Sequence, residues 1–421
     1  MQKTFKRNVG WIFIGNVAHA VLQYLLNIYI ARVFSTDDYG LINYAASLIA
    51  FFTSVGTLGF SGIIIKSFSE DEKNTGKYLG SAIGARLMFS VGAIVLLQVI
   101  VRTANSEDAM LPTIVFYQSI SILFGAFDLI VYWFRYKYEA QRVAVLKLAA
   151  FFVSAAWRIV VVAVFRSLTG YVFGVTLETA VFSILLAVSF RKNYPEHRFH
   201  FSARTVRDLL LISYPFITSE ILSTIYGQTD KIMLKSMMNN EAVAMYSVAL
   251  TLAGAISIIP QALIEGFRPD ILKYRATDPA QYHRRLKQLY ASVFWICIAY
   301  CIAITVLAKW IILILYGEKY LGAVPALSLV VWYTTFSYFG SINNIYMVAE
   351  NKAKWVQITT LVGALTNVCL NFLLIPRFGV VGAAGASLLT QFIANFVMVY
   401  LIKPLREDFF LILQAIRLDF K

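Results

Sequence analysis

The sequence predicts an all-α integral membrane protein with twelve transmembrane helices, in two six-helix halves around a central cavity. The halves are expected to be related by a pseudo-two-fold axis along the membrane normal. Three observations lead to this fold class. Hydrophobic residues make up 59% of the 421 residues and charged residues only 14%, too little charge for the surface of a soluble chain. The apolar residues gather into twelve long segments, and Lys and Arg fall unevenly between them.

Each apolar segment is long enough to cross a bilayer as a helix, which takes about 20 residues. Each is also too long for a transmembrane strand. In chain order the segments are 10–31, 39–64, 80–101, 111–134, 144–165, 169–190, 209–229, 242–264, 289–315, 323–348, 355–375 and 379–402.

The basic residues predict the orientation of these segments. With both termini in the cytoplasm, the inner connections and tails hold 27 of the 37 Lys and Arg residues and the outer ones hold 8. Cytoplasmic loops carry such an excess in membrane proteins. The asymmetry also explains most of the net charge of +14, so no nucleic-acid partner is expected.

A basic, proline-containing connection divides the chain into two halves that resemble each other weakly. Asn43–Leu48 in the second segment reads like Met245–Leu250 in the eighth. Because each half has an even number of helices, both enter from the same side, which places the repeat axis along the membrane normal. The expected organisation is an N-terminal half 1–190, a cytoplasmic linker 191–208, a C-terminal half 209–402 and a cytoplasmic tail 403–421.

A polar stripe follows one face of the first segment. Its members recur at spacings of three and four residues: Asn16, His19, Gln23 and Asn27. Such a stripe either lines a polar cavity or bridges neighbouring helices. A comparable run in the seventh segment, from Glu220 through Thr224 to Gln228, favours the cavity, with Asn16 and Glu220 expected to face each other across it.

Several ionisable residues lie deep inside predicted spans, where each costs roughly 2.5–3.5 kcal/mol on insertion. Arg86 matches Asp128 in depth and Arg158 matches Glu178. Each pair either forms a structural ion pair or leaves its arginine free to meet substrate. Glu220 has no basic residue at its depth in the next segment, and is either a protonated, hydrogen-bonded group or a carrier of a proton or cation.

Lys66, Arg268 and Lys147 lie at predicted cytoplasmic helix ends. They either extend toward the membrane surface or form a basic entrance that attracts phosphate. The predicted substrate-binding residues are therefore Asn16, Gln23, Asn27, Asn43, Lys66, Arg86, Arg158, Thr224 and Arg268. The predicted ion-coupling residues are Glu220, Asp128 and Glu178. No catalytic motif, cofactor or metal site is expected.

Two stretches resemble a known family. The run Ile314–Tyr320 with Ala323–Leu327, and the run Asn367–Gly385, look like junctions of bacterial polysaccharide transporters. With twelve helices, the resemblance covers essentially the whole chain and indicates the Wzx-type O-antigen and repeat-unit flippases. These lie within the multidrug/oligosaccharidyl-lipid/polysaccharide exporter superfamily. The Gly and Pro signatures are structural and identify no substrate contacts.

This resemblance implies a multi-pass protein of the bacterial inner membrane that serves polysaccharide or lipopolysaccharide biosynthesis. It would move undecaprenyl-pyrophosphate-linked oligosaccharide to the periplasmic leaflet by alternating access, with proton or cation antiport. Its partners would be this substrate and membrane lipids, and binding of other polysaccharide-assembly proteins stays open. The alternatives are a multidrug cation antiporter, a lipid II flippase with two further helices, and a membrane-embedded polymerase. Short outer connections disfavour the last.

Overall fold

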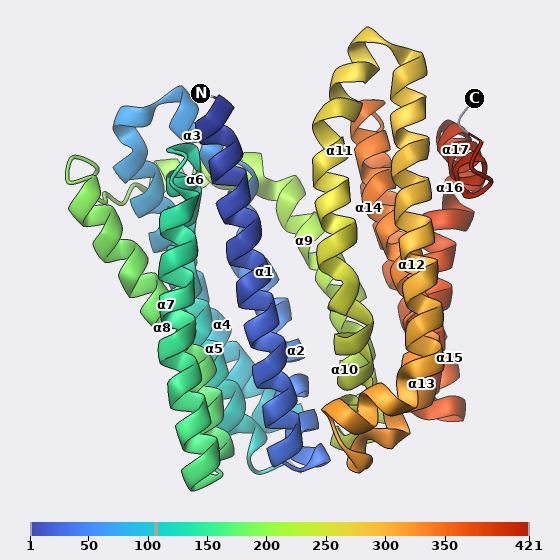
Figure 1. Cartoon of the computed structure of the whole chain (residues 1–421). Coiled ribbons are helices and arrows are strands. Elements are labelled where there is room, and N and C mark those ends of the chain that lie inside the picture. The colour runs from blue at the N-terminus through green and yellow to red at the C-terminus, as the bar shows by residue number, and fades with distance from the viewer. Residues whose placement is uncertain (1, 105–107, 420–421) are drawn as a thin grey trace. The chain divides into compact units, whose positions relative to one another are not determined.

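The computed structural model describes residues 2–104 and 108–419, with all their side chains except those of 2–9, 12, 13 and 104. The chain divides into two compact units, Met1–Thr224 (unit 1) and Ile225–Lys421 (unit 2) (Figure 1). This division lies inside helix α9 (Ala203–Met237). The predicted halves, which separate at the linker 191–208, stay a prediction.

Unit 1 is built from long helices that pack side by side. In chain order these are α1 (Gln2–Val33), α2 (Thr36–Gly56), α3 (Ile64–Glu70), α4 (Thr75–Ala104), α5 (Leu111–Gly125), α6 (Leu129–Tyr136), α7 (Ala140–Val160), α8 (Leu168–Asn193) and the first part of α9. Short 3₁₀ or π turns follow α2, α3, α5 and α7. Helix α8 packs along both α5 and α7, and α1 packs on α7, so these four helices form one wall of the unit.

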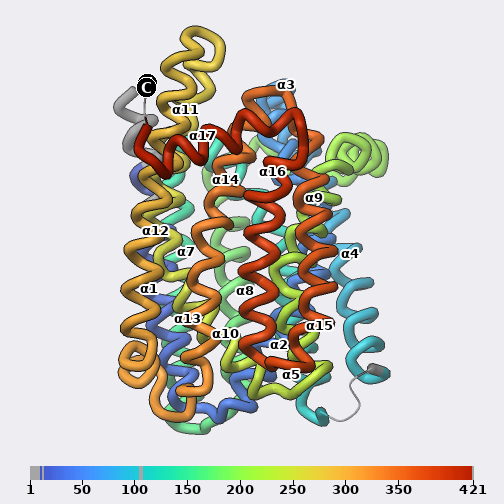
Figure 2. Tube along the Cα trace, turned by 90° about the vertical axis from the view of Figure 1, so that its right-hand side faces the viewer, coloured from blue at the N-terminus to red at the C-terminus, as the bar shows by residue number. Residues whose placement is uncertain are grey.

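Unit 2 continues α9 and adds eight helices. They are α10 (Asn240–Gly254), α11 (Ile258–Thr277), α12 (Pro279–Leu315), α13 (Val324–Val330), α14 (Tyr333–Ala349), α15 (Lys354–Phe392), α16 (Met398–Leu401) and α17 (Arg406–Ile416). Helix α17 lies crosswise over the ends of the longer helices of this unit (Figure 2). It packs against α12 through Leu411, Ile412 and Ala415, which are buried.

Local side-chain chemistry sets where several helices begin. Ser35 accepts a hydrogen bond from the Asp38 N–H at the start of α2, and Asn239 does the same for Ala242 at the start of α10. Such N-caps satisfy backbone donors that have no partner within the helix. They help to explain why breaks occur here between consecutive apolar segments.

The described residues contain ten helices long and apolar enough to cross a membrane, or eleven if the bent pair Glu318–Val330 and Tyr333–Ala349 is one span. The structure thus confirms a multi-pass helical membrane protein. The count of twelve stays a prediction. The predicted count divides Lys354–Leu401 into two spans, whereas the structure counts these 48 residues as one. This stretch breaks at Gly379, where φ is 57°. Glycine adopts this conformation without the penalty that a side chain would bring.

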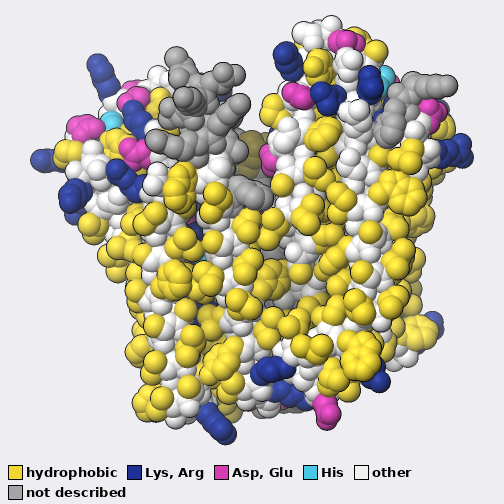
Figure 3. Space-filling model, in the orientation of Figure 1, with side chains coloured by type: hydrophobic (Ala, Val, Ile, Leu, Met, Phe, Trp, Pro, Cys, Tyr) yellow, Lys and Arg dark blue, Asp and Glu magenta, His cyan; other side chains and the backbone are white. Residues whose placement is uncertain are grey.

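The surface agrees with a membrane environment. On the face seen in Figure 3, hydrophobic side chains cover the middle of the helices in each unit, and charged side chains gather near the helix ends. Large apolar side chains on these helices are widely exposed, including Val95, Phe152 and Val306. Exposed apolar area on this scale indicates contact with lipid rather than water.

Candidate functional site

A charged hollow of about 320 Å³ lies inside unit 1 between α1, η3 (Ala126–Asp128), α6, α7 and α8. Its lining residues are Asn16, His19, Asp128, Val131, Tyr132, Arg135, Val143, Lys147, Ala150, Glu178, Thr179 and Phe182. Asp128 and Glu178 are acidic, whereas Arg135 and Lys147 are basic. Four charged groups thus share one small space. We call this space the charged hollow.

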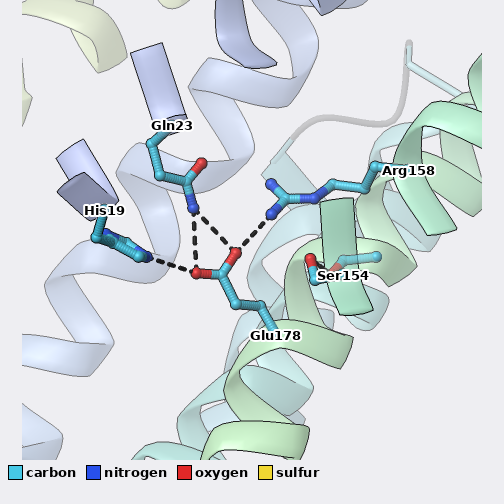
Figure 4. A network of polar contacts seen from close by, with 6 residues as sticks. His19, Gln23, Ser154, Arg158 and Glu178 are labelled. Carbon is cyan, nitrogen blue, oxygen red and sulfur yellow. Dashed lines mark hydrogen bonds and ion pairs between the residues drawn. The ribbon is translucent and has the colours of Figure 1, made fainter. Parts of the chain in front are cut away.

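Glu178 is the best-satisfied group of this hollow (Figure 4). Its carboxylate accepts from the Arg158 guanidinium at 2.5 Å and from the Gln23 amide at 2.9 Å, and its other oxygen lies 2.8 Å from His19 Nε2. Three helices, α1, α7 and α8, meet at this carboxylate. We call these four residues the Glu178 network. The depth match that paired Arg158 with Glu178 in the sequence corresponds to a real ion pair.

Gly174 makes the burial of Arg158 possible. Arg158 is 2% exposed, and a Cβ placed on Gly174 would lie 2.4 Å from its Cγ. The aliphatic stem of the arginine therefore occupies the space that any other side chain on α8 would need. Ser154, one turn before Arg158, donates to the Gly174 carbonyl at 2.8 Å. Together these contacts hold α7 and α8 close enough for the ion pair to form.

The second predicted pair does not form. Arg86 Nε instead donates to the Gly56 carbonyl at 3.1 Å, where α2 ends. A cation there offsets the partial negative charge of a helix C-terminus. Asp128 lies in the charged hollow, and its Oδ1 is buried without a hydrogen-bond donor among the described residues. The two side chains interact electrostatically at longer range. Of the two alternatives for this pair, the direct ion pair is therefore absent, because Arg86 bonds the end of α2 instead.

Lys147 is a cation of the charged hollow that no carboxylate among the described residues neutralises directly. It is half-buried, and within the described part of the chain it makes no hydrogen bond or ion pair. Asp128 and Glu178 interact with it only through longer-range Coulombic attraction. An ammonium group in this position can bind an anionic group that enters the hollow.

A second hollow of about 680 Å³ in unit 1 has a different chemistry. Its lining residues come from α2, α5, α8 and α9 with Thr57: Ala46, Ile49, Ala50, Thr53, Ser54, Thr57, Gln118, Ser121, Val175, Ser219, Glu220, Ser223 and Thr224. Small hydroxyl side chains dominate its polar surface. They recur four residues apart, as in Thr53 and Thr57 at the end of α2, or Ser219 and Ser223 on α9. We call this space the hydroxyl hollow.

Glu220 belongs to the hydroxyl hollow and has partners that the sequence did not indicate. The Thr57 hydroxyl donates to its carboxylate, and the Ser61 hydroxyl lies 3.4 Å from the other oxygen. The carboxylate is therefore hydrogen-bonded, not isolated as its depth in the sequence suggested. Asn16 and Glu220 line different hollows.

The polar stripe on α1 divides between the two interpretations that the sequence left open. His19 and Gln23 bridge to α8 through Glu178, whereas Asn16 is exposed and lines the charged hollow. Asn27 is half-buried. One helix face therefore contributes both to helix packing and to the wall of a hollow.

Three other predicted residues lie outside both hollows. Asn43 donates to the Tyr39 carbonyl of its own helix at 2.8 Å. Lys66 is 73% exposed and lies 3.6 Å from Glu70. Arg268, in unit 2, is 46% exposed and bonds Glu265 at 2.8 Å. Thr224, by contrast, lines the hydroxyl hollow. As substrate-binding residues, all four stay predictions.

Sequence reasoning missed a buried carboxylate in unit 2. Asp230 is 5% exposed. It accepts hydrogen bonds from one side chain on α10 and from three on α15, two before the break at Gly379 and one after it: Tyr246, Asn367, Asn371 and Ser387. We call these five residues the Asp230 network. All four donors are neutral. Lys231 interacts with Asp230 electrostatically but forms no ion pair with it. The paired asparagines in the 367–385 run were the signal in the sequence.

No group of three or more His, Cys, Asp and Glu side chains gathers as a metal site in the described part of the chain. The polar groups described above are distributed as two hollows in one unit and one carboxylate network in the other.

The fold and these sites define a class: a multi-pass helical membrane protein with polar hollows inside its bundle. The solved structure of the lipid II flippase MurJ in an inward closed conformation has a similar fold. Its TM-score is 0.77 at 14% identity, and the match covers 97% of this chain and 91% of that one.

Residues 5–265 match the family described as polysaccharide biosynthesis protein. This range is more than half of the chain, so the chain belongs to that family, which confirms the family predicted from the sequence. The probable flippase AglR of Haloferax volcanii is 29% identical over 177 residues, 41% of this chain and 37% of the relative. The capsular polysaccharide biosynthesis protein CapF of Staphylococcus aureus is 18% identical over 409 residues, 94% and 99% of the two chains.

Proposed function

We propose that this protein is a flippase for undecaprenyl-pyrophosphate-linked oligosaccharide repeat units. It moves the polar head of the lipid from the cytoplasmic to the periplasmic leaflet by alternating access, while the polyprenyl chain stays in the bilayer. Family membership supports this proposal, as do relatives that are named as a probable flippase and as a capsular polysaccharide biosynthesis protein.

The charged hollow is the observation that carries the proposal. A pyrophosphate is an anion with several hydrogen-bond acceptors, and inside a membrane protein it needs cationic or N–H donors. Lys147 supplies an ammonium group without a direct counter-ion, and Arg135 adds a guanidinium at the same hollow. Glu178 is already satisfied by Arg158, Gln23 and His19, so it does not compete fully for Lys147.

We assign to the Asp230 network the coupling of substrate transport to the movement of a proton or a monovalent cation. The carboxylate lies buried among neutral donors, and a charge in such surroundings is stabilised further when a cation or proton compensates it. Tyrosine and serine oxygens can also coordinate a cation, and the amides of Asn367 and Asn371 can do so after rotation about their last bond. Asp128, Glu178 and Glu220 remain further candidates for ion coupling.

The distribution of basic residues supports the orientation, with both termini in the cytoplasm of a bacterial cell and the protein in its cytoplasmic membrane. In that orientation the substrate enters from the side on which lipid-linked sugars are assembled. The short outer connections of the sequence favour a transporter over a membrane-embedded polymerase.

Reconstitution tests the function directly. Proteoliposomes are loaded with a fluorescent polyprenyl-pyrophosphate oligosaccharide, and a membrane-impermeant glycosidase reports how much sugar reaches the outer face. We expect protein-dependent exposure, slowed about ten-fold by Lys147→Ala, which corresponds to about 1.4 kcal/mol of lost interaction. Lys192→Ala, an exposed lysine on α8 of the same unit, is the matched control and should behave as wild type.

Two outcomes of this experiment would contradict the flippase function. If the lipid-linked sugar stays inside while an organic cation such as ethidium crosses, the protein is a cation antiporter. If sugar units join into longer chains, it is a polymerase.

A further inference from the structure

Much of the polar wall of the hydroxyl hollow consists of hydrogen-bond acceptors. Four of its hydroxyl groups already donate to carbonyl oxygens of their own helices: Thr53 to Ile49, Ser54 to Phe51, Ser121 to Gln118 and Ser219 to Pro215. A hydroxyl has one hydrogen and two lone pairs. With the hydrogen engaged, each oxygen can only accept a further bond. The wall therefore suits a ligand that donates.

Two further groups strengthen this acceptor character. Gln118 lines the hollow and is 6% exposed, and its Oε1 accepts no hydrogen bond from any described residue. A buried oxygen of this kind costs stability until it finds a donor. The Glu220 carboxylate accepts hydrogen bonds from Thr57 and Ser61. A carboxylate can accept further hydrogen bonds beyond these two. Both groups favour a ligand rich in O–H donors.

The same wall disfavours the anionic part of a lipid-linked sugar. Among the described residues that line the hollow there is no Lys, Arg or His. Arg86 interacts with Glu220 electrostatically but bonds the Gly56 carbonyl and does not line this space. A pyrophosphate here would meet no cationic donor from the lining and would be repelled by the Glu220 carboxylate. The charged hollow offers it Lys147 and Arg135 instead.

We propose that the hydroxyl hollow binds the neutral sugar portion of the substrate, separately from the charged hollow that binds its phosphates. This inference rests on the proposed function and adds a second subsite with its own ligand class, uncharged polyhydroxylated sugars. Every sugar hydroxyl is a donor as well as an acceptor, so it matches a wall of hydroxyl, amide and carboxylate oxygens. The volume of about 680 Å³ falls within the roughly 300–1,000 Å³ typical of small-molecule sites.

Glu220 gives this subsite a selectivity. Its carboxylate accepts from neutral or amino sugars but repels acidic ones, such as uronic acids. The residues next to it on α9, Ser219, Ser223 and Thr224, are small enough to leave room for a ring.

The test separates sugar recognition from phosphate recognition. Purified protein in detergent is titrated with a free neutral oligosaccharide that carries neither lipid nor phosphate. Proteoliposomes then report the flipping of polyprenyl pyrophosphate with and without a neutral disaccharide. The variants are Gln118→Leu and Ser121→Ala, with Gln141→Leu, an exposed glutamine on α7, as the matched control. Thermal unfolding confirms that each variant folds.

We expect Gln118→Leu to weaken binding of the free oligosaccharide and slow flipping of the sugar-bearing lipid, each about ten-fold, with the sugar-free lipid unchanged. Ser121→Ala should act in the same direction but less, and Gln141→Leu should be silent. Equal losses for both lipids, or no loss in either hollow variant, would overturn the sugar subsite. A third outcome separates the two proposals. If the free oligosaccharide binds and Gln118→Leu weakens that binding, but the protein flips neither lipid, the sugar subsite is supported and the flippase function is contradicted.

Discussion

Unit 1 contains a half-buried carboxylate and unit 2 a buried one, and the two differ in the kind of donor that surrounds them. Glu178 in unit 1 accepts from the Arg158 guanidinium, with His19 and Gln23 beside it. Asp230 in unit 2 accepts only from neutral hydroxyls and amides. A carboxylate paired with an arginine stabilises a fixed contact, whereas one held by neutral donors can still take up a cation or proton. We therefore expect the two acids to respond differently when their charge or their partner is removed.

The largest effect should come from removing the arginine of the Glu178 network. Arg158→Met leaves the Glu178 carboxylate without its buried cation, and such a change costs about 3–5 kcal/mol of unfolding free energy. We expect the lower end because His19 and Gln23 still interact with Glu178. Chemical unfolding in detergent measures the loss. The double variant Arg158→Met with Glu178→Met should recover most of it, and unchanged stability of the single variant would contradict the structural role.

The opposite behaviour is expected at the Asp230 network. Asp230→Asn should change unfolding free energy by only about 1 kcal/mol, because the neutral donors keep one oxygen to bond. Gradient-driven flipping in proteoliposomes should fall about ten-fold or more, and its dependence on an imposed Na⁺ or pH gradient should disappear. Asp270→Asn, an exposed acid, is the control. Gradient dependence that survives Asp230→Asn would remove this residue from the coupling mechanism.

A third carboxylate, outside the membrane-spanning helices, extends the comparison. Asp408 on α17 is fully buried and accepts from the Tyr290 hydroxyl at 2.9 Å. Burial raises its pKa to about 7, although Tyr290 and Lys352 oppose the shift.

Because the pKa of Asp408 is raised, its neutral form stabilises the docked helix. The contribution of Asp408 to the stability of the docked helix is complete below the ordinary aspartate pKa of about 4. It is lost as the pH rises through the raised pKa of about 7. Amide exchange in α17, corrected for intrinsic rates, should therefore speed up several-fold between pH 5 and 8. Asp408→Asn should abolish this pH dependence. A profile that is flat in the wild type would contradict it.

The smallest effect is expected for an exposed pair. Lys66 and Glu70 lie 3.6 Å apart at the surface, and pairs of this kind contribute about 0–1 kcal/mol. Lys66→Ala should leave unfolding free energy within about 0.5 kcal/mol of wild type. A larger loss, measured in the same unfolding experiment, would show that Lys66 has a role beyond the surface pair.

Much of the fold follows from the sequence. Segment length and apolarity predict membrane-spanning helices because backbone groups in lipid must bond within a helix. The structure has a backbone break at Gly379, the first residue of the predicted segment 379–402. The family followed from runs around such glycines and prolines.

The partners of the polar residues were predicted less well. Depth in the membrane correctly paired Arg158 with Glu178, since two adjacent antiparallel helices must bring equal depths together. The same reasoning failed for Arg86, which bonds the Gly56 carbonyl at the end of a third helix. Glu220 looked isolated because its hydroxyl partners, Thr57 and Ser61, are uncharged and lie far away in the chain.

The sequence by itself therefore determined that the chain crosses a membrane as helices, which faces of those helices are polar and which family it belongs to. Helical periodicity carries that information because it depends on residues three and four positions apart. Only the tertiary structure decided which faces meet, because that depends on how helices pack. It placed a charged and a hydroxyl-lined hollow in one unit, and surrounded Asp230 with neutral donors in the other.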